Sequence, residues 1–348
     1  MATPSRPPGT ASGSGSSRYR GLIAFWGVVL LLLGGGGAVL EALGPLPASE
    51  PAFAARPVVA AAAAPAQPLI PPPDAALMEA APDEPGRNLP IVGPDGRAPM
   101  TVYAAHVDPA DKHPRVAMVI DGAGLDQAMT LRLLTDLPPA VDVAFSAYMP
   151  EELEESLTAK ARQTGHECLV SLPMEPSEAP LREEGERSLM TGQTPEHNHL
   201  NLEWALSRET GCVGATGASD GLAGERFAQT QGLGDVLNEV TKRGLLYLDP
   251  RTGAPDLGDV DSDLVRVATL TVDASPNGEP VTAELIDRQL GVLEHEAAVH
   301  GWAIGLAGPP KPVLLERIAV WANGLPAHGI SLVPLTAIPA PPKPPSEN

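Results

Sequence analysis

Residues 141–172 read VDVAFSAYMPEELEESLTAKARQTGHECLVSL and contain the pattern that decides the fold. An apolar run is followed by Pro150-Glu151-Glu152, a sequence typical of a helix start, and Gly165 then offers a helix end before a second apolar run. Glycine is favoured at that position because it adopts the left-handed conformation that closes many helices. The stretch therefore predicts one strand–helix–strand unit.

The same order of elements repeats from about residue 114 to residue 335, and a glycine follows five of the six expected helices. Strands that alternate with helices build a parallel sheet, which either closes into a barrel or stays open and doubly wound. About eight strands in this length favour an α/β fold with a parallel (β/α) barrel, complete or incomplete. The expected strands are residues 115–121, 141–146, 167–172, 212–215, 245–249, 265–272, 302–305 and 330–334, and the expected helices are residues 125–135, 151–163, 195–208, 229–243, 281–300 and 313–323.

The N-terminal part of the chain carries a membrane signal. Residues 21–40, GLIAFWGVVLLLLGGGGAVL, have no charge and are long enough to cross a hydrocarbon core of about 30 Å as a helix. Residues 1–20 contain three arginines and no acid, so the positive-inside rule keeps them in the cytoplasm and exports the rest. We predict a single-pass signal anchor in the cytoplasmic membrane and a domain in the periplasm. A signal peptide cleaved at the Ala-Phe-Ala of residues 52–54 is the alternative, and it also exports the domain.

Composition sets the remaining boundaries. Alanine and proline dominate residues 41–98, which predicts an extended linker, and residues 338–348 form a Pro-rich tail of the same kind. The folded domain is expected over residues 99–337. All 43 acidic residues follow the apolar segment, and the formal charge is −20. This charge argues against nucleic acid or an anionic lipid surface as a partner.

Cys168 and Cys212 are the two cysteines of the chain, and each lies in or beside an apolar run. Such runs are expected to be buried strands. We therefore predict two thiols in the core rather than a disulfide, although the expected compartment is oxidising.

Acidic residues follow three of the expected strands. Asp121 closes VAMVID, Glu175 follows CLVSLPM, and Asp249 closes LLYLD. The chemistry of parallel barrels lies at the C-terminal ends of the strands. Together these carboxylates would bind a cation or act as acid and base, whereas each alone would cap a helix or pair with a neighbour such as Arg251.

A Gly-x-Ser-x-Gly sequence at residues 217–221 follows an expected strand and matches the letters of a nucleophile elbow. Gly224 interrupts the helix that an elbow requires, so a loop is the preferred interpretation. Tyr148, Trp204 and Trp302 are the aromatic residues considered for sugar stacking, and both tryptophans also suit ordinary packing.

Five stretches in order resemble the divergent polysaccharide deacetylase family. They are VAMVIDGAG at residues 116–124, Asp-Leu-Pro at residues 136–138, GHECLVSLPMEP at residues 165–176, Leu-Met-Thr-Gly at residues 189–192 and LLYLDPRT at residues 245–252. The resemblance covers roughly residues 115–335 and implies the β/α barrel of metal-dependent carbohydrate deacetylases. It also implies catalytic roles for Asp121, Glu175 and Asp249, a metal at Asp121, and substrate contacts from Arg251 and Met174.

The chain departs from the family's pattern at four places. The usual Ile-Asp-Asp is Ile-Asp-Gly at residues 120–122, and the usual Leu-His-Leu-Pro-Met-Glu-Pro is Val-Ser-Leu-Pro-Met-Glu-Pro at residues 170–176. The usual Asn-Asn-His-Met-Gly-Ser is Thr-Gly-Ala-Ser-Asp-Gly at residues 216–221, and Gly-His-Pro is absent after residue 305. One acid and three histidines are replaced, so the remaining oxygen ligands would suit calcium, magnesium or manganese better than zinc.

We therefore predict an envelope-exposed, deacetylase-like domain that binds a cell-wall glycan or acts as a scaffold without catalysis, and no cofactor is required for that role. The alternative is an active metal-dependent deacetylase of an envelope polysaccharide or peptidoglycan, with a divalent metal. A third reading makes the domain a partner for another periplasmic protein.

Overall fold

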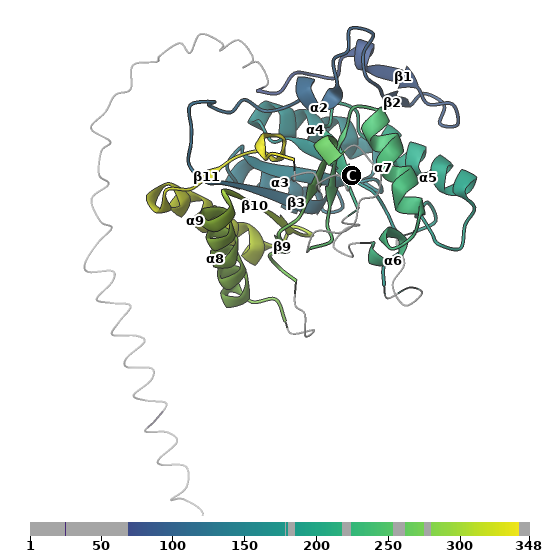
Figure 1. Ribbon diagram of the computed structural model, residues 1–348. Helices are drawn as coiled ribbons and strands as arrows, with labels where there is room; N and C mark the ends of the chain where they lie inside the picture. Colours follow the sequence, from purple (N-terminus) through teal and green to yellow (C-terminus); the bar gives the residue numbers. More distant parts are fainter. Residues whose placement is uncertain are drawn as a thin grey trace, which may run out of the picture. The chain divides into compact units, whose positions relative to one another are not determined.

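The computed structural model describes residues 25, 69–177, 179, 185–217, 224–252, 262–274 and 280–340 (Figure 1). Contacts divide the chain into two units, Met1–Ala63 and Ala64–Asn348, and the fold described below belongs to the second. Within the described ranges, no helix combines the length and the apolar character that a membrane span requires.

The predicted cytoplasmic tail of residues 1–20 and most of the predicted anchor of residues 21–40 lie outside the described residues, as does the Ser-containing loop motif after Gly217. Phe25 is the described residue of the anchor, and it is helical. The membrane anchor therefore stays a prediction from the sequence.

The folded domain begins before residue 99, so the predicted linker of residues 41–98 is too long. Ile70, Leu77 and Leu89 are buried, and Arg243 donates a hydrogen bond to Glu79 at 2.9 Å, which fastens this segment to the domain. The prediction used the overall Ala- and Pro-rich composition, in which these few large apolar residues carry little weight. The elements here are η1 (Ala75–Leu77), the antiparallel pair β1 (Met78–Ala80) and β2 (Asn88–Pro90), and α2 (Pro99–Val102).

The core of the domain is a nine-stranded sheet in which all neighbouring strands are parallel. The order is β8-β7-β6-β5-β4-β3-β10-β9, and β11 pairs with β3. The strands are β3 (Arg115–Ala123), β4 (Val141–Ser146), β5 (Cys168–Ser171), β6 (Gly214–Thr216), β7 (Leu246–Asp249), β8 (Val265–Val267), β9 (Leu270–Thr271), β10 (Trp302–Ala307) and β11 (Ser331–Leu332).

One short stretch joins the two ends of this sheet. The backbone N–H of Ala268 donates to the carbonyl of Asp249 in β7 at 2.9 Å, and the next residue, Thr269, donates to Ile304 in β10 at 2.8 Å. β7 and β10 lie next to the outermost strands β8 and β9, so two consecutive residues bridge the two ends of the sheet. The sheet curls into a parallel β/α barrel, which confirms the predicted fold class.

Helices surround the barrel, and each of the six predicted helices is present within three residues of its expected ends. Pro150 precedes α4, whose first turn carries three glutamates that interact favourably with the helix dipole. Gly165 ends α4 with φ 85°. The helices are α3 (Gln127–Asp136), α4 (Glu151–Thr164), α5 (Pro195–Arg208), α6 (Glu225–Ala228), α7 (Gly232–Lys242), α8 (Ala283–His300) and α9 (Pro312–Gly324).

Alternate residues of the strands face the helices and the barrel interior. In β3, Met118 and Ile120 pack in one cluster with helix residues, whereas Ala117 and Val119 belong to the interior cluster. Small and branched side chains fill the interior because opposed strands leave limited space there. The barrel is therefore a packed core, and only its ends are available for chemistry.

The chain's own terminal segments close the N-terminal end of the barrel, which we call the base. Leu335 is buried in the interior cluster, and its N–H donates to Asp142 at 2.6 Å. Glu167 accepts hydrogen bonds from the N–H of Ala105 at 2.8 Å and from the hydroxyl of Thr336 at 2.5 Å. Burial raises the pKa of Asp142 well above its ordinary value and raises the pKa of Glu167 to about 7.

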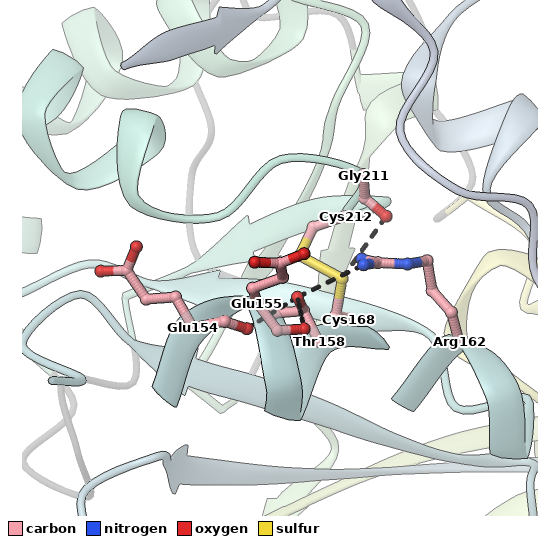
Figure 2. The surroundings of a disulfide bond; sticks show 7 residues. All are labelled: Glu154, Glu155, Thr158, Arg162, Cys168, Gly211 and Cys212. Carbon is pink, nitrogen blue, oxygen red and sulfur yellow. Dashed lines mark hydrogen bonds between the residues drawn. A yellow bond between two sulfur atoms is a disulfide. The ribbon is translucent and has the colours of Figure 1, made fainter. Parts of the chain in front are cut away.

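A disulfide joins Cys168 and Cys212, so the prediction of two thiols is wrong (Figure 2). The N–H of Val213 donates to the carbonyl of Cys168 at 2.9 Å, which places the two cysteines side by side with Cα atoms 4.7 Å apart. That separation lies within the range of disulfides. The sequence indicated two neighbouring apolar runs, but it did not show their register.

Candidate active site

The C-terminal ends of the parallel strands meet at the end of the barrel opposite the base, which we call the mouth. Five polar residues are buried here at the ends of five neighbouring strands. They are Asp121, Ser146, Ser171, Thr216 and Asp249.

Three of these residues form a row of hydroxyl groups across the mouth. The register pairs Ser146 with Ser171, and Ser171 with Thr216. Ser146 and Ser171 follow the interior residues Ala144 and Leu169 by two positions, so they share the inward face of the sheet. The Ser146 hydroxyl accepts from the N–H of Tyr148 at 3.2 Å, and the Thr216 hydroxyl donates to the carbonyl of Leu248 at 2.9 Å. We call these three residues the hydroxyl row.

Asp121 lies at one side of the mouth, in tight contact with β10. A Cβ atom at Gly308 would lie 2.4 Å from the carbonyl oxygen of Asp121, so only glycine fits at this approach. The N–H of Gly308 donates to the carboxylate of Asp273 at 3.2 Å. Asp273 is mostly buried, and this burial raises its pKa.

Asp273 is a site residue that the sequence reasoning missed. It directly follows the expected strand of residues 265–272, and this was the signal used for Asp121 and Asp249. Gly308 brings Asp273 and Asp121 to the same side of the mouth.

Glu175 lies beyond the end of β5, and its carboxylate is held by its surroundings. One oxygen accepts from the N–H of Thr191 at 2.7 Å, and the other lies 3.3 Å from Nε of Arg226. Met174 is buried and forms a bridge with Leu189. Both residues therefore fix the loop that follows β5.

Asp249 forms an ion pair with Arg251, with 2.6 Å between Oδ2 and Nη2. The other terminal nitrogen of Arg251 donates to the carbonyl of Ala228 in α6 at 2.9 Å. Three strands separate β7 from β3 in the sheet order, so Asp249 and Asp121 lie on different sides of the mouth. Asp121, Glu175 and Asp249 are among the described residues, and they do not form a group that could hold a metal ion. Their predicted catalytic roles stay a prediction from the sequence.

Comparison with known proteins identifies the family. A model described as divergent polysaccharide deacetylase matches residues 118–338. The chain belongs to the divergent polysaccharide deacetylase family. None of the curated proteins matches it.

Three solved structures are similar to this divergent polysaccharide deacetylase family member. The uncharacterized protein ATU2773 from Agrobacterium tumefaciens C58 is 32% identical with a TM-score of 0.64, and the match covers 72% of this chain and 99% of that chain. The catalytic domain of peptidoglycan N-acetylglucosamine deacetylase from Eubacterium rectale ATCC 33656 is 14% identical with a TM-score of 0.41, covering 68% and 95%. A family 4 carbohydrate esterase from Streptomyces lividans, in complex with acetate, is 12% identical with a TM-score of 0.37, covering 63% and 91%.

The resemblance to metal-dependent carbohydrate deacetylases implies a divalent metal. The side-chain donors at the mouth therefore decide whether this domain fits one. Among the residues that the structure describes, no group of three or more His, Cys, Asp or Glu residues could hold a metal ion. The hydroxyl row supplies neutral oxygens at three strand ends, and these are poor zinc ligands compared with His or Cys. The described residues do not fit a zinc site. Ser219 and Asp220 lie outside them.

The two tryptophans considered for sugar stacking fit the alternative expectation of ordinary packing. Trp204 packs against Tyr148 with 5.1 Å between ring centroids, and the guanidinium groups of Arg187 and Arg208 lie 5.6 and 5.9 Å from its ring centroid. Trp302 begins β10 and therefore lies near the base. The chain's own side chains occupy the surroundings of Trp204, and Trp302 is at the wrong end of the barrel for the mouth.

Proposed function

We propose that this divergent polysaccharide deacetylase domain binds a glycan of the cell envelope at its mouth and does not hydrolyse it. The hydroxyl row of Ser146, Ser171 and Thr216 carries this proposal. Hydroxyl groups both donate and accept hydrogen bonds, which suits the hydroxyl groups of a sugar. They supply neither the charge nor the ligand strength that activates a metal-bound water.

The arrangement of the carboxylates supports a binding role. Glu175 and Asp249 are engaged by Arg226 and Arg251, and each pair also fixes a loop or helix. A general base must reach the proton that it removes, and these ion pairs compete with that contact. The two residues act as structural supports of the mouth in this proposal.

An envelope location is part of the same proposal. The apolar segment of residues 21–40 predicts export, and the disulfide between Cys168 and Cys212 is typical of oxidising compartments. Peptidoglycan or another cell-wall glycan is the substrate class that the family suggests. A periplasmic protein partner remains a prediction from the sequence.

One observation favours an active deacetylase as the second candidate. The backbone carbonyl of Asp121 and the carboxylate of Asp273 approach the same glycine, and burial raises the pKa of Asp273, as is common for acids in active sites. An oxygen-rich set that included Asp121 would suit calcium, magnesium or manganese. The hydrolytic step would then depend on Asp121.

Acetate release separates the two candidates. The full-length chain is incubated with acetylated chitooligosaccharide and with peptidoglycan fragments, each in the presence of zinc, manganese, magnesium or calcium. We expect binding of the glycan by calorimetry and no acetate release above that of Asp121→Asn. Acetate release that depends on one metal and disappears in Asp121→Asn would establish the deacetylase instead.

A further inference from the structure

A cavity of about 370 Å³ lies outside the barrel, between the first halves of α5 and α7. These helices pack against each other, and α6 packs against α7 (Figure 1). A second groove of about 570 Å³ continues along the same two helices and shares Pro195, His199 and Asp235 with the cavity. The two form one continuous furrow, and the cavity alone has the size of a small-ligand site.

The floor of the furrow is apolar, and its walls are polar. Leu202, Phe227 and Val236 are buried at the floor. Gly232 leaves room for the ring of Phe227, because a Cβ atom at this position would lie only 2.8 Å from the ring. The polar side chains of the walls belong to Thr191, Gln193, Asn198, His199, Thr230, Gln231 and Asp235.

Asn198 makes one wall rigid. Its side-chain amide donates to the carbonyl of Met190 and accepts from the N–H of the same residue, both at 2.9 Å. The next N–H, that of Thr191, donates to Glu175 at 2.7 Å. Asn198 of α5 therefore holds Met190, and Glu175 holds the next residue, Thr191.

The chemistry of the walls selects a neutral, hydroxyl-rich ligand. Amide, hydroxyl and imidazole groups donate and accept hydrogen bonds, and Asp235 adds one exposed acceptor. The described residues that line the 370 Å³ cavity include no arginine or lysine. Lys242 lines the adjoining groove, where it pairs with Glu239 at 3.4 Å, so an anionic ligand in the cavity would meet the carboxylate of Asp235 without a compensating cation beside it. An apolar floor with a few polar groups is typical of sites that bind compact ligands.

We propose that this furrow is a second glycan subsite, which binds the outer rings of an oligosaccharide whose inner rings occupy the mouth. The inference rests on the proposed glycan-binding function. Thr191 lines the furrow, and its N–H donates to Glu175, which lies beyond the end of β5, so one hydrogen bond joins the furrow wall to the loop that follows β5. The ligand is a neutral oligosaccharide that is longer than a disaccharide.

Asp235→Ala tests the furrow, and Glu152→Ala is the matched control. Both substitutions remove an exposed carboxylate from the first turn of a helix, so any loss of interaction with the helix dipole is similar. Calorimetry on the full-length chain compares chitobiose, chitohexaose and an oligogalacturonate as the anionic probe. Gln231→Trp, which fills the cavity from an exposed position, is the second variant.

We expect Asp235→Ala to weaken chitohexaose binding about tenfold, the loss of one hydrogen bond to a charged group, while chitobiose binding stays unchanged. Gln231→Trp should give the same pattern, Glu152→Ala should match the wild type, and oligogalacturonate should not bind. If both furrow variants bind chitohexaose as the wild type does, the furrow is not a subsite, and the proposed function stands. If the wild type binds neither neutral oligosaccharide, the proposed function fails, and the subsite fails with it.

Discussion

The same two strands carry different chemistry at the two ends of the barrel. Asp142 in β4 and Glu167, which directly precedes β5, lie at the base, whereas Ser146 and Ser171 end the same strands at the mouth. The acids at the base bind the chain's own terminal segments. Buried carboxylates alone therefore do not identify a functional site, because Asp142 and Glu167 hold the segments that close the base.

The disulfide is expected to be the strongest single support of the base. Cys168 opens β5 directly after Glu167, and Cys212 follows it 44 positions later in the chain. Replacing both cysteines by serine should lower the free energy of unfolding by about 4 kcal/mol, because the unfolded chain loses a long crosslink. Urea denaturation measures this change. The wild type after full reduction is the control, and a reduced wild type as stable as the oxidised protein would contradict the expectation.

The C-terminal segment around Leu335, which closes the base, is expected to contribute slightly less to the free energy of unfolding than the disulfide does. Leu335 is fully buried, so Leu335→Ala should cost about 3 kcal/mol of unfolding free energy through lost burial and a cavity. Leu125, which is 50% exposed, provides the control Leu125→Ala. Chemical denaturation should show little change for the control. Equal losses in the two variants would mean that the terminal segment does not close the base.

The acids at the base should make stability depend on pH. The pKa of Glu167 rises to about 7 and the pKa of Asp142 also rises on folding, so the folded state holds protons that the unfolded state releases. Stability should therefore be highest at acidic pH and fall, by on the order of 2 kcal/mol, as pH rises from about 5 to 8. Thermal denaturation across this range measures the slope.

Glu167→Gln is the informative variant for this pH dependence. The amide keeps the shape of the side chain and removes its titration, so the slope should become smaller. Glu152→Gln, an exposed position on α4, should keep the slope of the wild type. A wild-type stability that rises between pH 5 and 8 would contradict the assignment of raised pKa values.

The mouth should tolerate substitution best. Ser171→Ala removes one hydroxyl group and should change the free energy of unfolding by less than about 1 kcal/mol, although Ser171 is buried. Glycan affinity should nevertheless fall several-fold. Denaturation and calorimetry on the same preparation give both values, and an unchanged affinity would remove Ser171 from the binding surface.

Local patterns were sufficient to predict most of the barrel. Pro150 with its glutamates and Gly165 defined α4 because helix ends depend on nearby residues. The disulfide required the register of β5 and β6, which only the assembled sheet fixes. Apolar residues hidden in the Ala- and Pro-rich segment, such as Leu77, concealed the true start of the domain.

The candidate site was predicted in part. The strand-end rule found Asp121 and Asp249, and the loss of histidine at Ser171 was visible from the resemblance. The partners of Glu175, which come from residues 16 and 51 positions later in the chain, depend on tertiary structure. The same rule, that functional acids follow the C-terminal ends of strands, also applies to Asp273, which directly follows the expected strand of residues 265–272.

A chelator experiment decides whether the mouth binds glycan without a metal. Chitohexaose binding to the full-length chain is measured before and after treatment with a metal chelator, and acetate is measured in the same sample. If the mouth binds glycan without a metal, binding persists with unchanged affinity after chelation, and no acetate is released. Binding that disappears after chelation, or acetate release that a divalent metal restores, would contradict a metal-independent glycan-binding mouth.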